Sequence, residues 1–98
     1  MIEPLEVYLL QVQDKNPAQA EQALASLALF SDVRALTAIQ TAFFHPNQQV
    51  RAAAAQAAGI NLDSILFEEL LSLQDDPEPE VRLAAVLALG KYAKKGHQ

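Results

Sequence analysis

The amino-acid sequence predicts an all-α fold, an α-solenoid in which three helical hairpins, six helices in all, form a right-handed superhelical stack. The first observation is an internal repeat: the segments HPNQQVRAAAAQAAG (45–59) and DPEPEVRLAAVLALG (76–90) superimpose with an offset of 31. Self-similarity at a period of about 20 to 50 residues is typical of solenoids. The second is that apolar residues recur at helical spacings, with only three glycines and five prolines to interrupt them. The hairpins are expected at about 3–30, 31–60 and 61–95.

In the first hairpin, the first helix is expected to begin at Pro4, because proline is favoured at the first helical position, and to stop near Asp14. A second helix is expected over about 17–29. Asn16 offers it a cap, and Gln19 a reciprocal acceptor. The apolar stripes of the two helices are Leu5, Tyr8, Leu9 and Val12, and Ala20, Ala23, Leu24 and Leu27.

In the second hairpin, Ser31 is the expected cap of the first helix, which ends before His45 and Pro46. The following helix runs through Ala57. It is expected to close at Gly59, because glycine best takes the left-handed conformation beyond a helix end. The residues expected to be buried in the first helix are Leu36, Ile39 and Phe43.

The third hairpin is expected to combine an amphipathic helix over about 63–73 with a helix from about Pro79 to Lys94. The acidic turn QDDPEP joins them, and lysines lie at the negative dipole end of the last helix. In the 63–73 helix the apolar side comprises Leu66, Phe67, Leu70 and Leu71, and the polar side Glu68, Glu69 and Ser72.

All three hairpins share one plan. Two sets of positions in their first helices recur with the same offset of 31, namely Leu5, Leu36 and Phe67, and Tyr8, Ile39 and Leu70. In the second helix of the first hairpin the offset between matching positions is predicted to slip from 31 to 30. Ala20, Ala23 and Leu27 then correspond to Val50, Ala53 and Ala57. Small residues repeated on one face indicate that neighbouring helix axes approach closely.

Composition limits the classes of function. The 98 residues are expected to form one domain, 1–98. A net charge of −5 with scattered basic residues argues against nucleic-acid binding. The absence of cysteine excludes disulfides, thiolate catalysis and cysteine-based zinc sites. The opening MIEPLEVYLLQVQDK has no basic segment and too short an apolar stretch to span a bilayer, so we expect a cytoplasmic protein without a membrane partner.

A turn proline, Val-Arg four positions later, paired alanines and a glycine form a pattern that resembles the HEAT repeat, in the short form found in phycobilisome-lyase-like proteins. The resemblance covers 45–95 well and 3–30 less well. It implies that Val50 and Val81 lie in the core. It also implies a ladder that ties neighbouring repeats together, made by Arg51, Arg82 and the carboxylate of Asp76. His45 in the place of Asp76, and Glu21 in the place expected for the first arginine, limit this ladder to two basic rungs.

The last helix is the second informative feature, because only Arg82 interrupts the apolar run from Val81 to Leu89. One stripe is expected inside, which leaves Leu83, Val86 and Leu87 on the opposite face. Ends of solenoids normally carry a polar cap. Either the preceding hairpin and the lysine-rich tail fill this face, or it docks a partner protein or a second copy of the chain.

Second helices line the concave side of a HEAT-like stack, so the resemblance extends the candidate surface. The candidate protein-binding residues are Gln49, Ala52, Gln56, Glu80, Leu83, Val86 and Leu87. For the three polar ones, simple solvation is the alternative. The acidic run Asp75, Asp76, Glu78 and Glu80 either steers a basic partner or offsets the positive end of the last helix.

No residues with catalytic spacing stand out. His45 and His97 lie in a turn and in the tail, without a second imidazole at helical spacing, and no glycine-rich phosphate loop is present. No metal and no cofactor are expected. The leading hypothesis is therefore a non-catalytic scaffold or regulatory binding module for another protein, with a homodimer through the last helix as one form. Resemblance alone supplies the alternative, a phycobilin lyase or lyase-like subunit that holds a tetrapyrrole and its acceptor protein.

Overall fold

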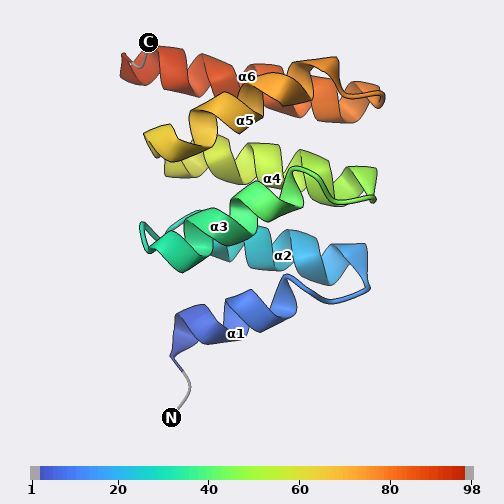
Figure 1. Ribbon diagram of the computed structural model, residues 1–98, viewed down its shortest axis with the longest axis vertical. Coiled ribbons are helices and arrows are strands. Elements are labelled where there is room, and N and C mark those ends of the chain that lie inside the picture. Colours follow the sequence, from blue (N-terminus) through green and yellow to red (C-terminus); the bar gives the residue numbers. More distant parts are fainter. Residues whose placement is uncertain (1–2, 97–98) are drawn as a thin grey trace.

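The computed structural model describes residues 3–96, which form three stacked helical hairpins measuring 40 × 27 × 15 Å (Figure 1). Helices α1, α3 and α5 make one layer and α2, α4 and α6 the other, with α4 between α2 and α6. The predicted all-α solenoid is confirmed. The elements are α1 (Pro4–Gln11), α2 (Pro17–Leu27), α3 (Val33–Ala42), α4 (Gln48–Asn61), a 3-10 turn (Ser64–Leu66), α5 (Phe67–Ser72), a second 3-10 turn (Leu73–Asp75) and α6 (Pro79–Lys95).

The turn inside each hairpin is built in the same way. The side chains of Asp14, His45 and Asp76 each accept a hydrogen bond from the backbone N–H two residues further on, at 2.8 to 3.0 Å. These three residues stand 31 apart. The N-caps of α2, α4 and α6 follow the same period, at Asn16, Asn47 and Glu78.

The period of 31 therefore continues into α2, and the expected slip to 30 is wrong. Gln19, Gln22 and Ser26 take the places that Val50, Ala53 and Ala57 hold in α4. Ala20, not Glu21, stands at the position of Arg51. The apolar match at 30 was misleading because α2 buries a different stripe, Ala20, Ala23, Leu24 and Leu27, and carries polar residues where α4 carries small apolar ones.

The alanines of α4 are buried on both sides of the helix, because α2 and α6 pack against it. Gly59 lies inside α4, which continues to Asn61, so the prediction that the helix closes at Gly59 is wrong. Leu62 takes the left-handed conformation instead, with φ of 63°. A Cβ at Gly59 would lie 3.0 Å from Ala88 Cα. Glycine is therefore needed here for the close approach of α4 and α6, not for a turn.

Two local predictions are corrected by side-chain contacts. Asp32, not Ser31, caps α3, because its carboxylate accepts the N–H of Arg34. Gln19 makes no capping box, since its amide oxygen accepts a hydrogen bond from Gln11 of α1. The predicted lysine-rich helix end is present: α6 ends at Lys95, whose ammonium group donates to Leu62 O.

Across the described range, none of the helices combines the length and the apolar content that crossing a bilayer requires. His97, which the sequence places in the tail, lies outside the described residues.

Candidate protein-interaction surface

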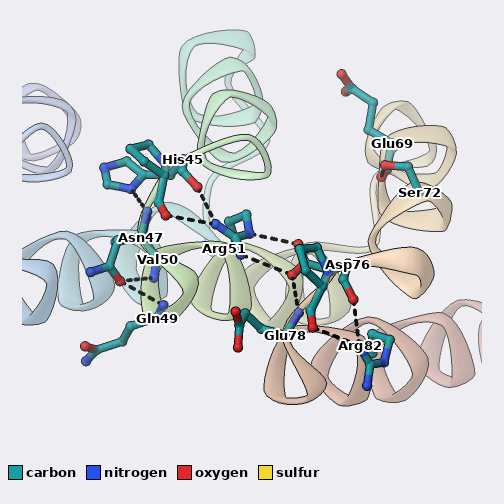
Figure 2. A network of polar contacts seen from close by, with 12 residues as sticks. His45, Asn47, Gln49, Val50, Arg51, Glu69, Ser72, Asp76, Glu78 and Arg82 are labelled. Atoms are coloured by element: carbon teal, nitrogen blue, oxygen red, sulfur yellow. Dashed lines mark hydrogen bonds and ion pairs between the residues drawn. The ribbon is translucent and has the colours of Figure 1, made fainter.

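Arg51 joins the second hairpin to the third through a nearly buried ion pair. Its Nε donates to Asp76 Oδ2 at 2.8 Å and its Nη2 to Asp76 Oδ1 at 3.1 Å, so the contact is bidentate (Figure 2). These hydrogen bonds hold the pKa of the Asp76 carboxyl below its ordinary value, and they outweigh burial, which acts in the opposite direction. The third donor, Nη1, binds the carbonyls of His45 and Pro46.

Arg82 repeats the second half of this arrangement. Its Nη1 donates to the carbonyls of Asp76 and Pro77 at 2.8 and 3.1 Å, the same distances that Arg51 makes to the corresponding carbonyls of the preceding turn (Figure 2). No carboxylate of the described residues lies in ion-pair contact with Arg82. The two arginines thus share a backbone anchor but differ in the carboxylate.

The outer side of α6 carries Leu83, Val86, Leu87 and Gly90, which we name the α6 face. Leu83 and Leu87 are each 60% exposed and Val86 is 53% exposed. Neither the preceding hairpin nor the lysine-rich end of α6 covers them. By the period of 31, Leu83, Val86 and Gly90 occupy the positions of Ala52, Ala55 and Gly59, which α6 buries on α4.

A groove of about 380 Å³ runs between α4 and α6 and connects to the α6 face through Leu87. It is lined by Gln56, Gly59, Ile60, Ala84, Leu87, Ala88 and Lys91. Of these, Gln56 and Leu87 are among the predicted residues and Lys91 is not. Lys91 takes the place of the apolar Ile60 one repeat later and adds a cation to a mainly apolar wall. The departure from the repeat at that position was the available signal.

The other predicted site residues are placed differently. Glu80 is exposed at the start of α6, and Gln49 is exposed but donates to Glu21 at 2.8 Å. Ala52 is only 8% exposed, because α6 covers this side of α4, so it offers almost no surface to a partner. Including Ala52 in the surface is therefore corrected.

The acidic run near α6 does not act as one unit. Asp76 is buried and paired with Arg51, whereas Asp75 and Glu80 are exposed. Within residues 3–96 no three His, Asp or Glu side chains lie close enough together to hold a metal ion. His45 serves the turn, since its Nδ1 accepts the N–H of Asn47.

A second hollow of about 530 Å³ lies between α1 and α3, and Arg34 is the charged residue on its wall. Arg34 is engaged by Asp32 at 3.1 Å and Glu3 at 3.4 Å. Its cation is therefore already balanced by two carboxylates, and this hollow lacks the unpaired charge that marks the region around Arg82.

Comparison with known proteins adds the family. The family model described as HEAT repeats matches residues 2–89, nearly the whole of the stack described above. No curated protein matches the chain.

Proposed function

Because the chain belongs to the HEAT repeat family, we propose that it is a non-catalytic scaffold or regulatory module that binds another protein through the α6 face. HEAT repeats are protein-interaction modules. The cytoplasm is the location proposed for this activity.

One observation carries the proposal: the α6 face is apolar and exposed, and its Leu83, Val86 and Gly90 hold positions that the same repeat buries one hairpin earlier. Leu83, Val86 and Leu87 are adjacent on one helix side and more than half exposed. Contiguous exposed apolar side chains on a protein commonly mark an interaction site. The groove beside Leu87 extends this surface towards α4, and Lys91 gives it a charged edge.

The test is the substitution of Leu83 and Leu87 together by glutamate. Both side chains are exposed, so the fold should be retained, and binding through this face should be lost because two carboxylates cannot be buried without a partner charge. Binding proteins are recovered from native extract on the immobilised chain, and the mass of the free chain is followed by light scattering. A fall in mass on substitution would identify a homodimer through α6 as the occupant.

A matched control carries Val33→Glu and Phe44→Glu, which remove two equally exposed apolar side chains from the other layer. The control should retain every interaction of the native chain. If the Leu83 and Leu87 variant keeps the same mass and the same bound proteins as the native chain, the α6 face is not the binding surface and the proposal is wrong.

A further inference from the structure

The two arginines of the ladder, Arg51 and Arg82, differ in how many of their guanidinium nitrogens donate hydrogen bonds. Arg51 uses Nη1 for the turn carbonyls and presents Nε and Nη2 to Asp76. Arg82 uses Nη1 in the same way, while its Nε and Nη2 make no hydrogen bond to any residue between 3 and 96. The carbonyl contacts of Nη1 therefore hold the guanidinium of Arg82 in place. Its Nε and Nη2, the edge with which Arg51 binds Asp76, stay unused within the described residues. Planar bidentate donors of this kind match the oxygens of carboxylates and phosphates, and in this molecule the equivalent edge of Arg51 binds a carboxylate.

The apolar half of the same interface is also repeated. On α4, Ala52, Ala55 and Gly59 receive the third hairpin, and Gly59 lets the helices approach until Ala88 fills the space. On α6, Leu83, Val86 and Gly90 hold these positions, and a Cβ at Gly90 would meet nothing within 4 Å. Arg82, Leu83, Val86 and Gly90 therefore bring together the positions that bind a hairpin inside the molecule, with larger apolar side chains in place of two alanines.

A second copy of the chain satisfies only part of this surface. Stacked head to tail, its first hairpin would bring Asp14, which sits in the turn as Asp76 does. However, the α2 side beside it carries Gln19, Gln22 and Ser26 instead of small apolar residues. In an antiparallel pairing of two α6 helices, the lysine-bearing end of one helix would lie opposite Arg82 of the other, so like charges would face each other.

We propose that Arg82 and the α6 face bind a helical hairpin of a partner protein, and this deepens the proposed function on which it rests. The partner's turn presents an aspartate to Nε and Nη2 of Arg82, as Asp76 does for Arg51. The helix after that turn lays small apolar side chains on Val86 and Gly90, as α6 lays Ala84 and Ala88 on α4. The partner is thus recognised as a further repeat of the same kind.

The experiment uses a probe made from this chain. The probe carries Gln19→Val, Gln22→Ala and Ser26→Ala, which give its first hairpin the repeat's own docking pattern beside Asp14, and Leu83→Glu, which blocks its own α6 face. A second probe keeps Gln19, because Gln19 bonds Gln11 and its loss could disturb α1. Circular dichroism and thermal melting check that each probe is folded, and calorimetry measures its binding to the native chain.

The expected result is a saturable one-to-one complex. Arg82→Gln in the native partner should weaken it roughly 30-fold, and Asp14→Asn in the probe by a similar factor, with no further loss when both are combined. Val33→Glu in the native partner is the control and should leave the affinity unchanged. Failure of both folded probes to bind, or binding that is insensitive to Arg82→Gln and Asp14→Asn, would overturn the inference.

The outcomes separate this inference from the proposed function. If the native chain binds extract proteins through Leu83 and Leu87 but the probe complex ignores Arg82, the interaction surface stands and only the nature of its partner is wrong. If native chains dimerise through α6 with Arg82→Gln having no effect, a second copy is the occupant and the inference is overturned. If Leu83→Glu in the native partner changes neither the binding of extract proteins nor the binding of the probe, the proposed function and this inference are both overturned.

Discussion

Gly59 and Gly90 hold the same position in successive repeats, yet their surroundings are opposite. A Cβ on Gly59 would meet the backbone of α6 at 3.0 Å, whereas a Cβ on Gly90 would meet nothing. Ala55 and Val86 show the same contrast, one fully buried and the other 53% exposed. One stacking surface therefore occurs twice in the molecule, filled on α4 and open on α6.

The difference shows that the repeat specifies a surface as well as a fold. Inside the stack that surface is satisfied by the next hairpin, with a bidentate ion pair at its edge and a close helix contact at its centre. At α2 the side that would face a preceding repeat is polar, at Gln19, Gln22 and Ser26. The outer side of α2 is thus polar at these positions, whereas the corresponding side of α6 is apolar.

The largest expected difference between the two surfaces concerns the arginines. Arg51→Ala leaves the carboxylate of Asp76 buried without its cation, and we expect it to lower the free energy of unfolding by about 3 kcal/mol. Arg82→Ala removes hydrogen bonds to carbonyls near the surface and a weaker attraction to the Asp76 carboxylate, and should lower it by less than about 1 kcal/mol. Urea unfolding followed by circular dichroism measures both. Equal losses would mean that the Arg51 pair does not join the hairpins.

The same ion pair predicts a dependence on acid. The pKa of Asp76 is lowered in the folded chain, chiefly by its hydrogen bonds to Arg51, from an unfolded value of 3.8. The stability that the pair supplies is therefore complete above this value and is lost as the pH falls through the folded pKa. We expect the stability gap between the native chain and Arg51→Gln to narrow as the pH is lowered below 3.8. A gap that stays constant would contradict this assignment.

The glycines give the next effect. Gly59→Leu must push α4 and α6 apart, and overpacking of this kind should lower the free energy of unfolding by about 2 kcal/mol. Gly90→Leu meets open space on an exposed helix and should be neutral or raise it by up to about 1 kcal/mol, because glycine is a poor helix former. Thermal unfolding of the two variants side by side is the measurement. The comparison fails if Gly90→Leu proves as harmful as Gly59→Leu.

The smallest effect concerns how the third hairpin is closed on its inner side. The Tyr92 hydroxyl donates to Asp63 O at 2.7 Å, so Tyr92→Phe should lower the free energy of unfolding by about 1 kcal/mol. Burial, reinforced by the charge of Asp63, raises the pKa of Tyr92 from 10.0 to about 12. The stability that this hydroxyl supplies is present in full below pH 10.0 and is lost as the pH rises through the folded pKa of about 12. As the pH rises, the free energy of unfolding should fall more for the native chain than for Tyr92→Phe. Parallel curves of this free energy against pH would contradict the assignment.

The hairpin plan could be predicted from the sequence because each local signal agreed with the repeat. Proline at the first helical position, Asn16 as a cap and the apolar spacing of α3 all describe short-range chemistry, and the structure has each of them. Both Ser31 and the neighbouring Asp32 are residue types that can cap a helix. Asp32 is the cap of α3 because the helix begins at Val33, and the sequence alone does not fix that position.

Errors arose where a residue's role depends on a distant partner. Gly59 has the sequence features of a helix end, but Ala88 of another hairpin explains it. Ala52 is predicted on an open surface because the resemblance places second helices on the concave side, whereas α6 covers it. The slip to a period of 30 came from matching apolar letters in α2, although the turn at Asp14 keeps the period at 31. The exposure of Leu83, Val86 and Leu87 on α6 is one of two alternatives that the sequence leaves open, the other being cover by the preceding hairpin and the lysine-rich tail.

Single cysteines at the two matched positions test the central claim most directly, since the chain contains no cysteine of its own. Ala55→Cys should react with a thiol reagent only after unfolding, and so at least about 1,000 times more slowly than an unfolded thiol. Val86→Cys should react within a few-fold of the unfolded rate. Similar protection at both positions, whether both are shielded or both open, would contradict the account of one stacking surface that is filled on α4 and open on α6.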